Sequence, residues 1–300
     1  MVTLSTARAS NATFSAPYRP VALFVGGTSG VGQGTAEAFA RATKGNAHIM
    51  ICGRSQASAD KIIAALPTTP ESKYEFIECD ASLMKNVADT ASTIKARVGS
   101  LNYLILSQGI LTMQGFTPTA EGIDMKLALH FYSRWKFVDE LMPLLEKAKS
   151  DGQEARVMTI LDSTRGAPLD ETDLGLKKKY SLGSAAGQGI TYNNLMVEEY
   201  SKRYPQMSFT HIFPGMINTP LATRGMHWML KPVWGVLSTA FTSLQDCGEW
   251  MVYPLLLPAY RQGAFYLDNH GEQISQKKVI TSETARKTLV EHFKKETATA

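Results

Sequence analysis

Short apolar segments alternate with longer segments of helical periodicity along almost the whole chain, and this alternation limits the choice of fold more than any other feature. Such alternation predicts an α/β fold: a doubly wound parallel sheet of about seven strands with helices on both faces. Ligands of such sheets bind beyond the carboxyl ends of the strands. The predicted strands are Val21–Val25, Ala47–Cys52, Tyr74–Glu78, Tyr103–Leu106, Arg156–Leu161, Ser208–Ile212 and Ala264–Leu267. The predicted helices are Gly30–Thr43, Ser58–Leu66, Lys85–Val98, a long helix within Gly122–Lys149, Ser184–Tyr204 and roughly Ser282–Glu296.

No internal repeat and no linker interrupts this pattern, so residues 20–300 are expected to form one domain. Residues 1–19 are rich in Ser, Thr and Ala, and we expect a flexible or loosely docked tail there. No run of about 18 apolar residues occurs, so no membrane-spanning helix is expected. Cys52, Cys79 and Cys247 are far apart and lack metal-ligand spacing. They are predicted to be buried free thiols, with no metal site, which favours the cytoplasm.

The charge of the chain gives no sign of a nucleic-acid partner. The formal net charge of +4 is too small to argue for nucleic acid, and no stretch interleaves basic with aromatic residues. We therefore expect no nucleic-acid partner.

The first strand runs into a glycine-rich turn, Gly26-Gly27-Thr28-Ser29-Gly30-Val31-Gly32. Glycines permit a tight turn and a close approach of the backbone to a diphosphate. A helix that begins near Gly30 also offers free N–H groups and the positive end of its dipole. A plain turn between strand and helix is the alternative, which the glycines alone do not exclude. The residues predicted to hold a dinucleotide here are Gly26, Thr28, Ser29, Gly30, Val31 and Gly32.

The spacing Gly26-x-x-x-Gly30-x-Gly32 resembles the motif of the short-chain dehydrogenase/reductase family, although Val25 stands where that family usually has Thr. The resemblance covers about residues 20–270 and implies an NAD(P)-binding oxidoreductase. Further family landmarks follow in order. They are Asp80 and Ala81 after the third strand, Gln108 and Gly109 after the fourth, and Pro214, Gly215 and Thr219 after the sixth.

The end of the second strand, Cys52-Gly53-Arg54, favours one of the two nicotinamide dinucleotides. An acidic residue there would receive the ribose hydroxyls of NAD, whereas a basic one suits the 2′-phosphate of NADP. No acid is present and Arg54 is, so the predicted cofactor is NADP(H). An exposed loop arginine is the alternative interpretation of Arg54.

The catalytic positions depart from the family. No Tyr-x-x-x-Lys occurs in the predicted helix Ser184–Tyr204, where the family carries it. The resemblance to the retinol-dehydrogenase-like branch places Ala186 and Ile190 at the Tyr and Lys positions, and His130 at the position of the family's Asn. If the chain is an enzyme of this family, its proton donor is therefore non-standard.

Several residues are candidates for the missing chemistry, and a structural role stays open for each. Depending on the register, Ser163 or Asp162 takes the place of the family's serine. His130 and Arg134 share one helix face, and a histidine can donate a proton near neutral pH. Tyr180 lies just ahead of the helix that would carry the usual tyrosine, and Tyr192, which lies inside that helix, is expected to pack in the core.

A substrate lid is predicted at about residues 220–250, where Trp228, Trp234 and Phe241 accompany two methionines, Met226 and Met229. Such a composition suits a wide apolar pocket, with a subunit interface or a membrane-surface patch as alternatives. The predicted function is an NADP(H)-dependent carbonyl or imine reductase acting on a bulky apolar molecule. The alternatives are a non-redox cyclase or isomerase and a non-catalytic nucleotide-binding protein. The chain also resembles fungal relatives linked to secondary metabolism, and a homodimer is expected through the helices that carry His130 and Tyr192.

Overall fold

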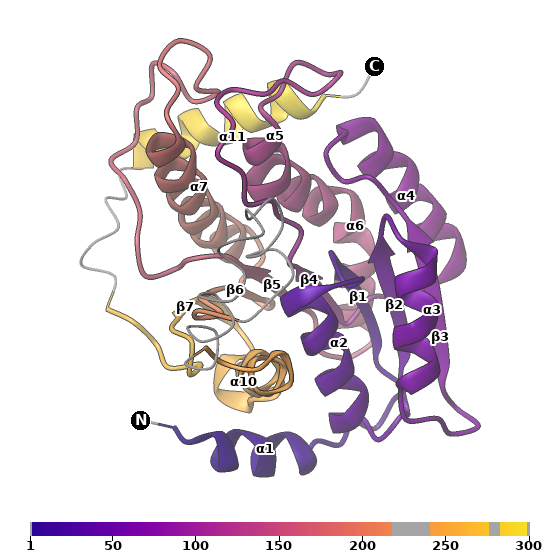
Figure 1. Ribbon diagram of the computed structural model, residues 1–300. Helices are drawn as coiled ribbons and strands as arrows, with labels where there is room; N and C mark the ends of the chain where they lie inside the picture. Colours follow the sequence, from indigo (N-terminus) through magenta and orange to yellow (C-terminus); the bar gives the residue numbers. More distant parts are fainter. Residues whose placement is uncertain (1, 218–240, 276–282, 299–300) are drawn as a thin grey trace, which may run out of the picture.

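The computed structural model describes residues 2–217, 241–275 and 283–298 (Figure 1). It contains a parallel seven-stranded sheet of order β3-β2-β1-β4-β5-β6-β7, which confirms the predicted fold class. The strands are β1 (Val21–Val25), β2 (His48–Gly53), β3 (Lys73–Glu78), β4 (Tyr103–Leu106), β5 (Arg156–Ile160), β6 (Ser208–Ile212) and β7 (Gly263–Leu267). The α-helices are α1 (Leu4–Ala12), α2 (Gly30–Ala42), α3 (Gln56–Ala65), α4 (Met84–Arg97), α5 (Met125–Leu127), α6 (Ser133–Ser150), α7 (Leu182–Arg203), α10 (Leu244–Leu256) and α11 (Glu283–Thr297).

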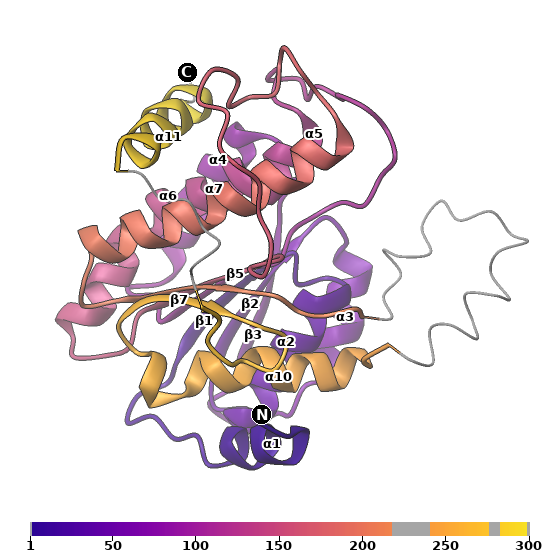
Figure 2. The same cartoon turned by 90° about the vertical axis from the view of Figure 1, so that its left-hand side faces the viewer.

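Helices cover both faces of the sheet, because its strands are apolar on both sides. In β1, Leu23 and Val25 join the core beneath α4, α6 and α7, while Ala22 and Phe24 join the core beneath α2, α3 and α10. Figure 2 shows the two layers, with α6 and α7 on one side of the sheet and α10 on the other. The order of the strands reverses between β1 and β4, so their carboxyl ends border the position where a doubly wound sheet binds its ligand.

Of the two expectations for residues 1–19, a flexible or a docked segment, α1 corresponds to the docked one, because it forms a helix against α10. Ala7 and Asn11 are buried against α10. The Asn11 Nδ2 group donates to the Glu249 carboxylate over 2.9 Å, and Arg8 pairs with Asp246 over 2.6 Å. Apolar packing and polar contacts with distant residues together hold the helix, and hydrophobic periodicity within the segment does not reveal these partners.

The long helix predicted within Gly122–Lys149 is interrupted near its start. Asp124 caps α5 by accepting the N–H groups of Lys126 and Leu127 over 3.0 and 3.2 Å. A π-helical turn, Ala128–Tyr132, then separates α5 from α6 and contains His130. The Asn193 side chain donates to the carbonyl of His130 over 2.7 Å and so ties α7 to this turn. Single π-turns of this kind are frequent at functional sites.

The predicted lid is only partly described. Thr219 and residues 220–240, which include Trp228 and Trp234, lie outside the described residues. Residues 244–250 form the first half of α10, which packs against α2. A Cβ atom on Gly248 would lie 2.1 Å from the carbonyl oxygen of Gly34, so α10 and α2 pack at very short range.

The C-terminal helix α11 packs against α7 and the π-helical turn. Arg286 reaches Glu198 and Glu199 of α7 over 3.0 and 2.8 Å. Tyr132 and His292 are hydrogen-bonded over 2.6 Å. Part of the surface expected at a subunit interface is therefore covered by the chain itself, and a homodimer through these helices stays a prediction.

The cysteine prediction is confirmed: Cys52, Cys79 and Cys247 are buried and free. Among the described residues, no group of His, Cys, Asp and Glu could hold a metal ion. In the same residues, no helix is long and apolar enough to cross a membrane.

Candidate functional site

A groove of 190 Å³ opens at the carboxyl ends of β1 to β4. Its lining contains most of the residues that the sequence predicts for cofactor binding. They are Gly26, Thr28, Ser29, Gly30, Val31, Arg54, Asp80, Ala81, Gln108 and Gly109, joined by Val25, Gly53, Cys79, Ser107 and Leu129.

The glycine turn is shaped by short backbone contacts. Gly26 and Gly30 have φ angles of +80° and +58°, in the left-handed region that favours glycine. A Cβ atom on Gly32 would lie 2.2 Å from Ser107 Oγ and 2.5 Å from the carbonyl oxygen of Gly26. No larger residue fits at this position without moving the turn, although Gly32 itself does not line the groove.

The turn ends at a helix terminus that is open to an anion. Ser29 is the N-cap of α2, but its side chain makes no capping hydrogen bond. The first turn of α2 also contains no acidic residue. Its N–H groups and the positive end of the helix dipole therefore face the groove without a competing carboxylate of that turn, as a bound phosphate requires.

Two charged side chains, Arg54 and Asp80, also line the groove. Arg54 is exposed and makes no ion pair with any described residue. Asp80 uses its Oδ1 atom to accept the N–H of Ser82 over 3.0 Å, so it caps the turn after β3 and also lines the groove. A free guanidinium is thus available where the sequence predicts recognition of a 2′-phosphate.

The segment after β6 has the expected turn. Gly215 has a φ of +84°, and the carbonyl of Pro214 accepts a hydrogen bond from the Cys247 thiol over 3.7 Å. These two residues do not line the groove as it is described.

Arg134 is not a catalytic group in this structure. Its side chain is almost fully buried and absent from the groove lining. The guanidinium donates to the carbonyl oxygens of Leu106, Gln108 and Ile160 over 3.1, 2.7 and 2.9 Å. It also donates to Thr159 Oγ1 over 2.7 Å. A buried cation without a carboxylate partner loses hydration, and burial lowers the pKa of Arg134 to about 9. Arg134 therefore fastens the ends of β4 and β5 together below the groove.

His130 lies behind Gly109 and does not itself line the groove, and its environment does not suit the predicted role of an acid. Its Nε2 atom accepts the N–H of Ile110 over 3.1 Å, and Gly109 packs against the ring. Burial, followed by the charge of Arg134, lowers the pKa of His130 to about 3. The imidazole is neutral near pH 7 and orients the segment after β4.

The two candidates after β5 are engaged in hydrogen bonds within the protein. Ser163 is buried, and its hydroxyl donates to the carbonyl of Leu267 over 2.5 Å. Asp162 accepts both the N–H and the hydroxyl of Thr164, over 3.0 and 2.5 Å. Ser163 therefore does not present its hydroxyl to the groove, and Asp162 performs the capping role that was its alternative.

Tyr180 has a partner that sequence reasoning missed. The Lys126 ammonium donates to the Tyr180 hydroxyl oxygen over 2.9 Å and to the carbonyl of Gln114 over 2.6 Å. Lys126 is buried and forms no ion pair with the described part of the chain. The Tyr180 hydroxyl also lies 3.5 Å from Asp124 Oδ1, and its ring meets Phe116 edge to face. A tyrosine and a lysine are thus in contact although α7 carries no Tyr-x-x-x-Lys.

The pair lies beside the groove in the chain but does not line it. Lys126 precedes Leu129 by three residues across the junction of α5 with the π-helical turn, and neither Lys126 nor Tyr180 belongs to the groove lining. Leu129 lines the groove. The spacing could have been noticed in the sequence, but the contact with Tyr180, 54 residues away, could not.

The structure confirms that Tyr192 packs in the core. It is fully buried, packs on Phe131 and donates its hydroxyl to the carbonyl of Leu174 over 2.7 Å. Burial raises its pKa. Tyr192 is a core residue.

A parallel sheet with a glycine turn at its switch point defines a dinucleotide-binding protein of the Rossmann type. Residues 20–229 match the family described as short chain dehydrogenase. A protein of Emericella nidulans named as an oxidoreductase is 34% identical over 262 residues, which span 85% of this chain and 77% of that protein. The chain therefore belongs to the short-chain dehydrogenase family, as its sequence predicts.

Further similarities agree with this assignment. Human polyprenol dehydrogenase is 27% identical over 85% of this chain and 79% of its own length. Among solved structures, the Pseudomonas aeruginosa RhlG/NADP complex has a TM-score of 0.64 at 17% identity, covering 85% of this chain and 96% of that one. An NADPH-bound carbonyl reductase from chicken fatty liver has a TM-score of 0.62 at 15% identity, covering 87% and 100%. At these identities the structural matches show the shared fold.

Proposed function

We propose that this chain is an NADP(H)-dependent oxidoreductase that reduces a carbonyl or imine group of a bulky apolar molecule. The observation that supports it best is the groove of small residues that ends at the free Arg54 guanidinium. A relative named as an oxidoreductase and solved family structures that hold NADP or NADPH support the same assignment. NADPH would supply the hydride when bound.

The glycine turn would hold the diphosphate against α2, and Arg54 would pair with the 2′-phosphate. A guanidinium is suited to phosphate because its planar N–H groups can donate in pairs. Asp80 and Ala81 would border the adenine, and Gln108 and Gly109 would border the ribose next to the nicotinamide. Pro214, Gly215 and Thr219 would lie on the nicotinamide side.

Tyr180 would donate the proton to the substrate oxygen or nitrogen as the adjacent carbon accepts hydride. The negative charge left on the phenol would be stabilised by the Lys126 ammonium, which is already 2.9 Å from the oxygen. Burial strengthens this attraction, because water screens the pair only weakly. His130 would orient the segment after β4, while Asp162 and Ser163 would hold the loop after β5.

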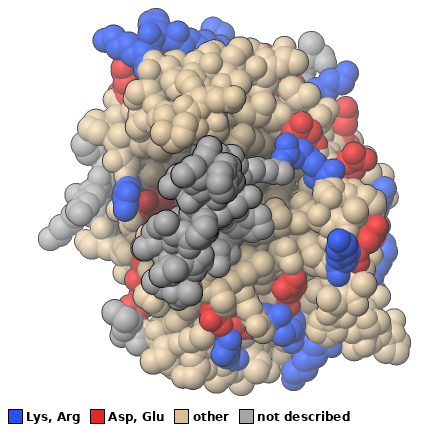
Figure 3. Space-filling view, in the orientation of Figure 1, with Lys and Arg blue, Asp and Glu red and all other residues tan. Residues whose placement is uncertain are grey.

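The proposal of an apolar substrate rests on the surface around the site. Among the described residues, three of the four exposed large hydrophobic side chains lie in one segment after β4, namely Leu111, Met113 and Phe116, and the fourth is Met216 after β6. Figure 3 shows that the visible middle of this face is formed mostly by uncharged residues, with Lys, Arg, Asp and Glu toward its edges. Exposed apolar side chains around a site are typical of a surface that receives an apolar ligand.

Cofactor choice is tested by calorimetry on Arg54→Gln. Loss of a charge-assisted contact worth about 1.5–3 kcal/mol weakens NADP binding about tenfold to a hundredfold and leaves NAD binding unchanged. Arg165→Gln, which alters another exposed arginine, is the control. Equal NADP affinity in wild type and Arg54→Gln would contradict the role of Arg54.

Proton donation is tested with a panel of hydrophobic ketones, aldehydes and imines. Tyr180→Phe should lower kcat by about 10²–10⁴-fold while NADPH affinity stays unchanged. Tyr192→Phe is the matched control, because it removes a hydroxyl that bonds only in the core. Product formation without consumption of NADPH would replace this proposal by a cyclase or isomerase, and nucleotide binding without any turnover would favour a non-catalytic protein.

A further inference from the structure

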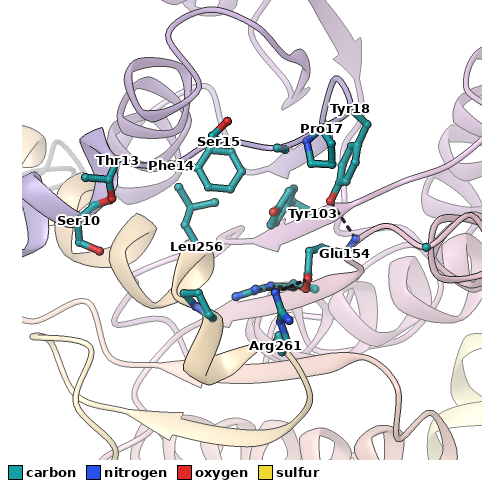
Figure 4. Close-up of a pocket in the computed structure, with 14 residues that line it drawn as sticks. Ser10, Thr13, Phe14, Ser15, Pro17, Tyr18, Tyr103, Glu154, Leu256 and Arg261 are labelled. Atoms are coloured by element: carbon teal, nitrogen blue, oxygen red, sulfur yellow. Dashed lines mark hydrogen bonds and ion pairs between the residues drawn. The ribbon is translucent and has the colours of Figure 1, made fainter.

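A second cavity lies at the other end of the sheet, near the amino ends of β4 and β5. It has a volume of 460 Å³ and is bordered by the segment after α1, the loop before β5 and the end of α10 (Figure 4). The cavity shares no lining residue with the nucleotide groove. Four or five strand residues separate the two sites, which corresponds to roughly 15 Å. A ligand in this cavity would therefore occupy a site distinct from the proposed active site.

The upper walls of the cavity are apolar and aromatic. In Figure 4, Phe14 and Leu256 lie on one side, and Pro17 and Tyr18 lie on the other, with Tyr103 between them. The Tyr18 hydroxyl accepts the N–H of Glu154 over 2.9 Å, which fixes the ring at the cavity wall. The space between these walls suits a flat apolar group, because aromatic rings gain from offset or edge contacts with a second ring.

The floor of the cavity is charged. The Glu154 carboxylate is shared by two guanidiniums, with Arg156 at 3.2 Å and Arg261 at 3.3 Å. Arg156 also donates to the carbonyls of Leu255 and Leu257 over 3.0 and 2.8 Å. Two cations face one carboxylate, so the floor has an excess of one positive charge.

The free hydrogen-bonding capacity of the floor belongs to Arg261. A guanidinium has five N–H donors, and the Glu154 carboxylate is the single described partner of Arg261. Arg156, in contrast, is buried and uses most of its donors in the protein. Arg261 can therefore bind a second, planar anion through paired N–H groups while it keeps Glu154.

We propose that this cavity binds a monoanionic aromatic acid. Its ring would lie between Phe14 and Tyr18, and its carboxylate would meet Arg261. The volume lies within the range of about 300–1,000 Å³ that is usual for small-molecule sites. The site does not depend on the proposed oxidoreductase activity.

Calorimetry with 1-naphthoate tests the site, and 1-naphthamide serves as its uncharged counterpart. The wild-type protein should bind 1-naphthoate at one site per chain, at least about tenfold more tightly than the amide, a difference of about 1.4 kcal/mol. Arg261→Gln should weaken 1-naphthoate binding by about the same factor, and Phe14→Ala should weaken both compounds.

Two control variants test whether binding depends on Arg261 in particular rather than on any arginine. Arg97→Gln alters another arginine that lies 3.3 Å from a carboxylate, that of Glu75, and it should leave binding unchanged. Arg54→Gln, at the nucleotide groove, should also have no effect. Absence of saturable binding, equal affinity for acid and amide, or unchanged affinity in Arg261→Gln would overturn the proposal. Loss of 1-naphthoate binding in Arg54→Gln would also overturn the proposal, because it would show that the acid binds in the nucleotide groove. This result would not depend on whether the chain is an oxidoreductase.

Discussion

Two histidines, the half-buried His130 and the fully buried His211, should make this protein sensitive to acid. His130 accepts the N–H of Ile110, and His211 on β6 is hydrogen-bonded through Nδ1 to Asn194 Oδ1 over 2.6 Å. Burial, followed by the charge of Arg134, lowers the pKa of each to about 3, and Lys126 adds to the effect on His130. Folding therefore favours the neutral imidazoles, and protonation favours the unfolded chain.

The pKa values set the pH range and the size of the effect. A group whose pKa falls from 6.5 in the unfolded chain to about 3 in the folded one stabilises the fold fully above pH 6.5. This contribution is lost as the pH falls from 6.5 toward 3. By pH 5 the loss amounts to about 2 kcal/mol for each histidine, which is large against a typical stability of about 5–15 kcal/mol.

Urea unfolding of wild type and His130→Asn at pH 7 and pH 5 measures this effect. The substitution changes the free energy of unfolding at both pH values, but it also removes one titrating group. His130→Asn should therefore lose about 2 kcal/mol less than wild type between the two pH values. Equal losses in the two proteins would refute the assignment of a neutral His130 in the folded protein.

Three further substitutions test the structural roles assigned above. Gly32→Ala should weaken NADP binding at least about tenfold in calorimetry, because its Cβ would meet Ser107 Oγ and the Gly26 carbonyl; unchanged affinity would contradict the packed turn. Arg134→Met should lower the free energy of urea unfolding by about 3–5 kcal/mol, because it leaves buried carbonyls unpaired; a loss below about 1 kcal/mol would disprove the fastening role. Asn11→Ala should expose the segment after α1 to limited proteolysis, since the bond to Glu249 is lost, and an unchanged cleavage pattern would speak against docking of α1.

The parallel sheet could be predicted because its strands are continuous apolar runs. The predicted Val21–Val25, Tyr103–Leu106 and Ser208–Ile212 agree with β1, β4 and β6 at both ends. The glycine turn could also be predicted, because the residues that shape it are adjacent in the sequence. Helices α1 and α10 were missed, because the partners of α1 are distant in the sequence and the first half of α10 falls inside the stretch interpreted as a lid.

The roles of the candidate catalytic residues could be predicted much less well than the cofactor groove. The positions of Ser163, Asp162, His130 and Arg134 follow from the fold, but their partners do not follow from the sequence. The Ser163 hydroxyl is bound by a carbonyl 104 residues away. Lys126, whose contact with Tyr180 rebuilds a tyrosine–lysine pair, carried no motif that could single it out.

The central claim is that the groove beyond β1 and β2 binds a phosphorylated nicotinamide dinucleotide. Isothermal titration of the wild-type protein with NADP and with NAD, under identical buffer conditions, tests this claim directly. Binding at one site per chain, with NADP at least about tenfold tighter than NAD, is the predicted result. Association of neither nucleotide, or tighter binding of NAD, would contradict it.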